Sequence, residues 1–434
     1  MASATLDYTP ELPGQKRREW LTISLVGVVH ASSHFFQLVL PLLYLSLAHE
    51  YGYDFVKLGL LASAFFLVSC LGQASSGFVV DRIGAAPVLR FGLSCFIASG
   101  ILIAVSNGYP VLLLAAVIGG IGNSVFHPVD FSILNHRISA HRLGHAFSTH
   151  GLTGNLGWAL TPVFMATIIY WANWRVAAFS AAGLVAFVLL LTWFGRNLLA
   201  GANTPKEQPA DYPAKADPDT VGQPDLANQT VMQTLRTLLA QPALWGAFLF
   251  FGFTSMALSA VQNYTIPMLG GVYGIDKIMA GTTLSAYMVA AALGMLVGGF
   301  LVSATPNTER TVAISLVLAG LLLVVLAYGA VPPSFAMGLV GLAGFCSGVS
   351  APSRDMLIRR VTPKGATGTV YGLVYSGMDV GSSLAPVGFG LMLDAGFVQG
   401  PWFGAATGFG VAAMLALWVA RSASHSATMR PANA

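Results

Sequence analysis

The chain has 434 residues, of which 55% are hydrophobic and only 9% are charged. Soluble proteins carry about 25% charged residues, so this composition excludes a soluble globular protein. The formal net charge of +4 could suggest a nucleic-acid partner, but the placement of the charges along the chain argues against that class.

Apolar runs of about 20 residues, the length that crosses a bilayer, recur along most of the chain. We expect twelve transmembrane helices, at 21–47, 55–80, 87–106, 109–136, 144–171, 174–197, 243–270, 277–303, 309–329, 333–360, 366–393 and 400–421. The predicted domains are an N-terminal segment (1–20), a six-helix bundle (21–197), a linker (198–242), a second six-helix bundle (243–421) and a tail (422–434). The fold class is therefore an all-α polytopic membrane protein.

Most of the 21 Lys and Arg residues fall at helix ends that are cytoplasmic if the N-terminus lies inside. Lys57, Arg175 and Lys277 fall on the other side, and Arg354 lies within a helix. This bias follows the positive-inside rule. It predicts a multi-pass protein of the inner (plasma) membrane with both termini, the linker and the tail in the cytoplasm, and no nucleic-acid partner.

The two halves of the chain resemble each other. The segment "GHAFSTHGLTGNLGWALTP" (144–162) aligns with "GTVYGLVYSGMDVGSSLAP" (368–386), 224 residues later, with Gly144/Gly368, Gly157/Gly381 and Pro162/Pro386 matched. A repeat of six spans keeps the same orientation in both copies. Parallel repeats of this kind form two bundles related by a pseudo-two-fold axis, with a cavity near the midplane that can alternate its access.

One loop carries a family signature. The segment "GFVVDRIGAAPVLRFG" (77–92) resembles the loop motif of the major facilitator superfamily at Gly77, Asp81, Arg82 and Gly84. The resemblance implies a secondary transporter in which this loop gates the cavity, with the eleventh helix as the partner of Asp81. Within the superfamily, "GIGNSVFHP" (120–128) is similar to the fosmidomycin-resistance-like branch.

The sequence departs from the superfamily pattern in two places. Ala85 and Ala86 stand where the loop motif usually has basic residues. In addition, "AAVIGG" (115–120) lacks the arginine that many proton-driven drug exporters carry about one turn before the glycines of the fourth helix. The direction of transport is therefore left open.

Four helices carry polar residues at spacings that share one helical face. These stripes are His30, His34 and Gln37; Asn123, His127 and Asp130; Ser255, Ser259 and Gln262; and Ser347, Ser350 and Arg354. The resemblance places the four helices around the central cavity. The predicted substrate-binding residues are His34, Gln37, Asn123, His127, Gln262, Asn263, Arg354 and Tyr375. His30, His150 and Asn155 could instead form hydrogen bonds that pack helices together.

Arg354 is the only Lys or Arg predicted within a span, and it cannot be neutralised, so it must meet an anion. That anion is either the substrate or a carboxylate such as Asp355 or Asp130. Asp130 lies 224 residues before Arg354, and we predict that the two pair as a gate when the cytoplasmic side closes. Asp379 lies in mid-helix and is the predicted proton-coupling residue, with His34 as the second choice.

The sequence thus predicts a proton-coupled secondary transporter for a small organic, anionic solute, acting as a monomer in the bilayer. It shows no nucleophile motif, metal-ligand spacing or phosphate loop, so we predict neither an enzyme nor a bound cofactor or metal. A drug or toxic-metabolite efflux antiporter is the alternative within the same fold. From other classes, a membrane haem protein with His34 and His127 as ligands, or a substrate sensor, remains open.

Overall fold

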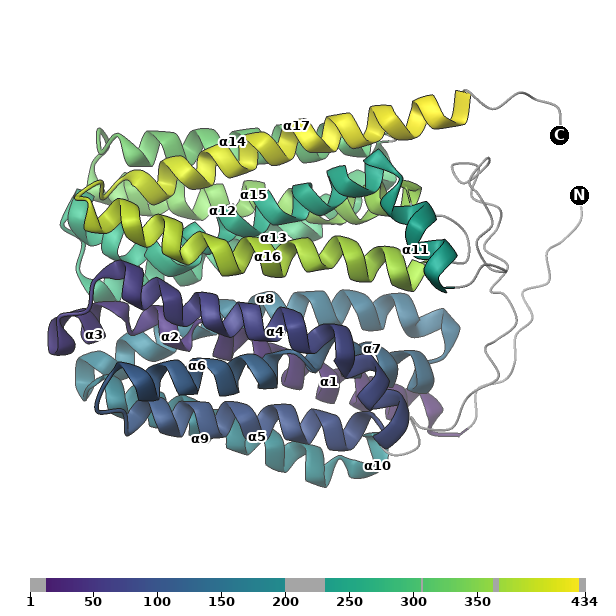
Figure 1. Cartoon of the computed structure of the whole chain (residues 1–434), viewed down its shortest axis with the longest axis horizontal. Helices are drawn as coiled ribbons and strands as arrows, with labels where there is room; N and C mark the ends of the chain where they lie inside the picture. Colours follow the sequence, from purple (N-terminus) through teal and green to yellow (C-terminus); the bar gives the residue numbers. More distant parts are fainter. Residues whose placement is uncertain (1–12, 200–230, 306, 362–366, 429–434) are drawn as a thin grey trace, which may run out of the picture.

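The computed structural model describes residues 13–199, 231–305, 307–361 and 367–428. The first group of helices is α1 (Gln15–Gln37), α2 (Val39–Leu42), α3 (Tyr44–Tyr51), α4 (Phe55–Ile83), α5 (Ala85–Ala104), α6 (Tyr109–Asn123), α7 (Phe126–Arg137), α8 (Ala140–Trp171), α9 (Trp174–Phe194) and α10 (Arg196–Leu199). The second group is α11 (Val231–Leu239), α12 (Pro242–Tyr273), α13 (Lys277–Ala304), α14 (Thr308–Ala327), α15 (Pro333–Val361), α16 (Thr367–Asp394) and α17 (Gly400–Thr428). Figure 1 shows the two groups as bundles lying side by side, with the axes of their long helices roughly aligned.

The surface of the bundles is apolar, as lipid contact requires. Ten helices among the described residues are long and apolar enough to cross a membrane. Large apolar side chains point outward from them, including Phe194 (85% exposed), Trp171 (80%) and Phe300 (78%). The two remaining spans are the segment from α1 to α3 and the helix α16. The arrangement is therefore a two-bundle, twelve-span membrane protein.

The first predicted span, 21–47, was expected as one helix, which is wrong, because the structure divides it into α1, α2 and α3. The backbone tightens at both junctions, where Leu38 donates to the carbonyl of Phe35 and Leu43 to that of Leu40. Pro41 lies between the junctions. It has no N–H to donate to the carbonyl one turn earlier, so the regular helical ladder cannot pass through this point.

The fourth predicted span, 109–136, is likewise divided, into α6 and α7, with the break at Ser124 and Val125. The physical cause is Pro128, which cannot donate to the carbonyl of Ser124. The hydroxyl of Ser76 on α4 donates to that carbonyl instead, at 3.1 Å. By contrast, α15 runs without a break through Pro352.

The internal repeat is visible in the packing. In the first bundle α1 packs on α8, α4 on α6, and α5 on α9; in the second, α12 packs on α16, α13 on α15, and α14 on α17. The same glycines serve both copies. A Cβ at Gly120 would collide with the carbonyl oxygen of Phe65, and a Cβ at Gly344 would collide with that of Tyr287. Small residues allow this close approach of helix backbones in membranes.

The bundles meet along α4 with α16 and along α8 with α13. We call the end of the molecule at which α4 and α13 begin the distal end. There, a Cβ at Gly59 of α4 would lie 2.5 Å from the carbonyl oxygen of Pro386, and a Cβ at Gly281 of α13 would lie 3.4 Å from that of Pro162. The two glycines and the two prolines are repeat partners, so the distal contact is itself pseudo-symmetric.

One carboxylate reinforces the distal contact. Asp394, at the end of α16, accepts hydrogen bonds from the backbone N–H groups of Phe55 and Val56, each at 2.8 Å. The next N–H of α4, that of Lys57, donates to the side chain of Asp54 at 2.7 Å. The N-terminus of α4, whose amides lack partners within the helix, is thus capped in part by the opposite bundle.

The predicted linker, 198–242, lies largely outside the described residues. The structure describes only its two ends, the last residues of α10 and the helix α11, which precedes α12.

Candidate functional site

A buried carboxylate lies at the centre of the first bundle. Asp130, on α7, has no exposed surface. Its Oδ2 atom contacts Nδ1 of His30 on α1 at 3.0 Å and Nε2 of His150 on α8 at 3.1 Å. The two imidazole rings stack with their centroids 3.5 Å apart. Asp130 therefore joins three helices, and the hydrogen bonds offset part of the cost of burying its charge.

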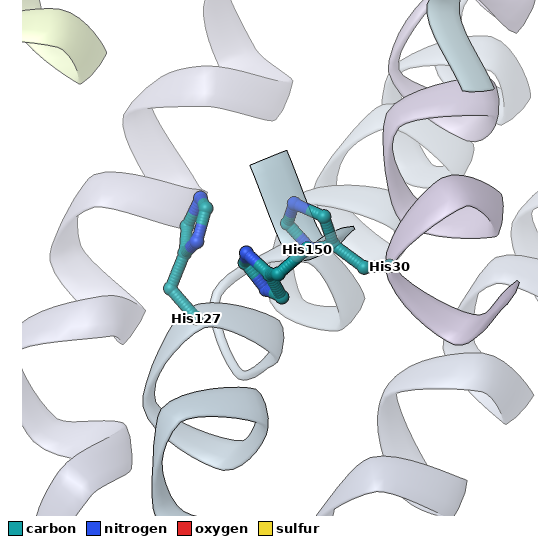
Figure 2. Close-up of side chains that lie close together, drawn as sticks. All are labelled: His30, His127 and His150. Atoms are coloured by element: carbon teal, nitrogen blue, oxygen red, sulfur yellow. The ribbon is translucent and has the colours of Figure 1, made fainter. Parts of the chain in front are cut away.

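Two further imidazoles surround this pair. The ring of His127, on α7, lies 5.3 Å from that of His30, and Figure 2 shows the rings of His30, His127 and His150 close together. The ring of His34 lies between His30, at 4.4 Å, and Trp158, at 4.2 Å. Both nitrogens of His34 are buried without a hydrogen-bond partner among the described residues. Burying an imidazole without a hydrogen-bond partner costs free energy. Side chains that bind a ligand often carry such a cost when the ligand is absent.

An amide network adjoins these rings. Gln37 donates to Asn123 at 3.0 Å and accepts a hydrogen bond from the indole of Trp158 at 2.9 Å. Asn123 in turn donates to Ser69 of α4 at 2.8 Å. Helices α1, α4, α6 and α8 are thus connected by side chains whose polar atoms are already paired.

The second bundle carries the isolated cation. Arg354, on α15, is partly exposed, and its Nε atom donates to Asp355 at 2.9 Å. Its guanidinium lies 5.0 Å from the ring centre of Phe251 on α12, which in turn packs on the ring of Tyr375 at 4.9 Å. Stacking on an aromatic ring fixes the plane of a guanidinium, and its planar fork matches the geometry of a carboxylate.

Three other predicted residues belong to this bundle. Asn263 donates to Ser259 of its own helix at 2.9 Å, and the amide nitrogen of Gln262 is buried without a partner among the described residues. Asp379, on α16, is partly exposed and lies within electrostatic reach of Cys70 on α4. Helix α16, which carries Asp379, packs against α4 of the opposite bundle.

For the predicted gates, the structure gives partial information. The side chain of Asp81 and the surroundings of Gly77 lie outside the part of the chain that the structure describes. Arg82 is exposed, and Gly84 ends α4 with φ of 91°, a backbone conformation that favours glycine. In this conformation Asp130 is held by its own bundle and Arg354 contacts Asp355, so the pairing of Asp130 with Arg354 in another state stays a prediction.

Helix α8 contributes two residues to the site that were not predicted to bind substrate. His150, which was expected to be able to pack helices together by hydrogen bonds, contacts Asp130, and Trp158 donates to Gln37 of α1. These two residues lie about two helical turns apart, and that spacing was the available signal.

Two bundles of six spans, related by a repeat and carrying polar clusters inside, define a polytopic helical transport protein. Both halves of the chain, residues 25–265 and 249–433, match the model of the Major Facilitator Superfamily. The chain therefore belongs to this superfamily.

Individual relatives agree with this assignment. The chain is 27% identical over 282 residues to the fosmidomycin resistance protein of Escherichia coli, a match that covers 64% of each protein. It is 24% identical over 361 residues to the probable nitrate/nitrite transporter NarK2 of Mycobacterium tuberculosis, covering 80% of this chain and 83% of that protein. The match to the fosmidomycin resistance protein thus spans less than two thirds of that protein's length.

The fold is also that of solved structures. A bacterial homologue of the human lysosomal transporter Spinster, in its inward-facing and unoccupied conformation, matches with a TM-score of 0.69 at 15% identity, covering 95% of this chain and 98% of that one. The occupied inward-facing form matches with a TM-score of 0.70 at 14% identity, covering 97% and 98%.

Proposed function

We propose that the protein is a secondary active transporter that moves a small organic anion across the cell inner membrane, coupled to protons, by alternating access. In this proposal both termini lie in the cytoplasm, as the placement of Lys and Arg supports, so the distal end faces outward. The contacts of Gly59, Gly281 and Asp394 then close the outer side, and the described conformation is one that is sealed toward the outside.

The observation that best supports an anionic substrate is the position of Arg354. A guanidinium within a span costs several kcal/mol unless it faces protein or water and meets a counter-charge. Arg354 is partly exposed, lies against Phe251 and contacts a carboxylate next to it in sequence. A carboxylate or phosphonate could compete with Asp355 for this guanidinium, since both anions match its planar fork.

Proton coupling is assigned to Asp379. It lies in the middle of α16, which packs on α4 of the opposite bundle. Alternating access changes the exposure of such a contact, so a proton bound on one side can be released on the other. The repeat partner of Asp379 is Asn155, which cannot titrate, and one bundle alone therefore carries this proton.

Export of an anionic drug or toxic metabolite is the second candidate. The match to the fosmidomycin resistance protein favours it over uptake. Since fosmidomycin is a phosphonate, the same guanidinium would serve either direction of transport.

A ligand screen on the purified protein tests the proposal. A panel of carboxylates and phosphonates that includes fosmidomycin is scored by the rise in Tm. We expect at least one anion to stabilise the wild type and Arg310→Gln, in which an exposed arginine outside the stack is removed, but not Arg354→Gln. Counterflow of that anion in proteoliposomes then separates a carrier from a sensor.

Equal stabilisation of Arg354→Gln and the wild type by every anion that binds would refute the anion site. Stabilisation of the wild type by uncharged solutes alone would refute the substrate class.

A further inference from the structure

Three imidazoles from three helices meet inside the first bundle. One nitrogen from each of His30, His127 and His150 lies within 4.8 Å of the others, and Figure 2 shows the three side chains converging. The geometry points to a binding site for a divalent transition metal of the zinc type, held by these imidazoles together with the carboxylate of Asp130. Its donors do not include Arg354 or Asp379, and the inference does not depend on the proposed substrate.

The donor set selects the class of ion. Imidazole nitrogens with one carboxylate oxygen suit Zn²⁺, Co²⁺ and Ni²⁺, whereas Mg²⁺ and Ca²⁺ prefer oxygen ligands throughout. The three imidazoles and Asp130 provide four donors, the number that zinc takes in closed sites. No cysteine is needed in such a set.

Two contacts of Asp130 are close to the distances that a metal requires, and the three imidazole nitrogens lie within 4.8 Å of one another. With metal–ligand bonds of about 2.1 Å in a tetrahedron, neighbouring ligand atoms lie roughly 3.4 Å apart. Oδ2 of Asp130 lies 3.0 Å from Nδ1 of His30 and 3.1 Å from Nε2 of His150. These contacts need to lengthen by a few tenths of an ångström.

The rings must also turn. Those of His30 and His150 are stacked at an interplanar angle of 23°, so their in-plane lone pairs do not yet meet at one point. Binding therefore requires the stack to open, and each ring to carry its proton on the nitrogen that faces away from the metal.

Unpaired polar atoms at the cluster favour the binding of a cation there. Asp130 is fully buried, and its Oδ1 atom has no hydrogen-bond partner among the described residues. Both ring nitrogens of the adjacent His34 are also buried without a hydrogen-bond partner among the described residues. Buried polar groups are rarely left so, and a metal at the carboxylate would compensate the buried negative charge. The partly exposed side chain of His127 provides the entry.

The test is Co²⁺ binding to the full-length protein, purified with a tag that contains no histidine and stripped of metals by a chelator. Four-coordinate Co²⁺ has strong visible absorption bands, and these report geometry as well as binding. We expect one saturable Co²⁺ per chain with four-coordinate bands, displaced by Zn²⁺, and a rise in Tm with metal.

Two variants place the site. His127→Gln and His150→Gln are expected to weaken Co²⁺ binding by roughly 100-fold or more, since even residues behind the ligands change metal affinity 10–100-fold. The matched control is His136→Gln on the same helix, α7, where the ring contacts the carbonyl of Ser132. This variant should bind Co²⁺ like the wild type.

The absence of saturable Co²⁺ and Zn²⁺ binding in the wild type would overturn the inference without any variant. Binding that persists unchanged in both His127→Gln and His150→Gln would overturn it as well, because the metal would then lie elsewhere. Neither readout depends on transport, so a failure here is distinct from a failure of the anion site.

Discussion

Replacement of Gly59 by alanine should open the distal end. A Cβ at this position would lie 2.5 Å from the carbonyl oxygen and 2.7 Å from the carbonyl carbon of Pro386. Ordinary contact begins at 3.4 Å, so α4 and α16 must separate by about 0.9 Å. Backbone atoms cannot turn aside as a flexible side chain can, and the hydrogen bonds between Asp394 and α4 would be strained by the same movement.

The magnitude follows from the energetics of overpacking. Inserting a methyl group into a packed contact typically costs about 1–3 kcal/mol. The clash exists only when the bundles touch, so it destabilises the conformation that is closed at the distal end. It therefore shifts the equilibrium toward the open conformation by a factor of about 5–150. Gly281→Ala, whose Cβ would lie 3.0 Å from the Cβ of Ala166 and 3.4 Å from the Pro162 carbonyl, should produce a smaller shift.

The assay is the labelling rate of a reporter cysteine at the distal contact. Ser46 lines a recess between the bundles together with Ile266 and Ile278, so Ser46→Cys is introduced after the native cysteines are replaced. A membrane-impermeant maleimide should label the Gly59→Ala variant fastest, the Gly281→Ala variant at an intermediate rate and the parent slowest. Gly183→Ala, where a Cβ would meet nothing within 4 Å, is the control.

Labelling of Gly59→Ala at the rate of the parent would refute the reasoning, provided that the variant is folded. Equal acceleration by Gly183→Ala would show that the effect does not arise at the contact between the bundles.

Three further predictions concern single side chains. Arg354→Lys should raise the KM for an anionic substrate roughly 10- to 150-fold, because lysine keeps the charge but lacks the planar fork of the guanidinium. This factor corresponds to the loss of about 1.5–3 kcal/mol of charged hydrogen bonding. Counterflow rates measure the KM, and an unchanged value would contradict the prediction. Asp379→Asn should abolish accumulation driven by a pH gradient but preserve exchange, as followed in proteoliposomes, and accumulation at the wild-type level would exclude Asp379 as the proton carrier. Glu50 lies in the last turn of α3, outside the predicted span 21–47, and is exposed. Hydrogen bonding from Trp174, followed by Arg175, lowers its pKa below the ordinary value of 4.5, so its stabilising effect is present above that pH and is lost as the pH falls further. Tm measured against pH should fall less steeply in the acid range for Glu50→Gln than for the wild type, and parallel curves would show that the contact does not matter.

The sequence predicts much of the fold because hydropathy and repetition are properties of the chain itself. The long apolar runs correspond to spans, and the paired glycines and prolines place corresponding helices in both bundles. The breaks at Leu38 and at Ser124 were not predicted, because a proline within an apolar run can bend, break or leave a helix intact, as Pro352 shows. The outcome depends on whether a neighbour such as Ser76 satisfies the released carbonyl.

The candidate site was predicted less completely, for a geometric reason. Helical spacing identifies which residues share a face, as for His30 and His34, but it does not determine which neighbouring helix that face meets. The stacking of His30 on His150, and their shared contact with Asp130, depends on how α1, α7 and α8 cross. One sequence contains no direct record of those crossings.

The capping of α4 by Asp394 connects gate opening with water. When the distal contact separates, two backbone amides lose their acceptor and both oxygens of the carboxylate lose their donors, so water must hydrate all four groups. The open state is therefore the more hydrated one, and solutes that are excluded from protein surfaces should favour closure. Osmotic conditions on the distal side would in this way bias the resting conformation, without any osmolyte occupying a binding site.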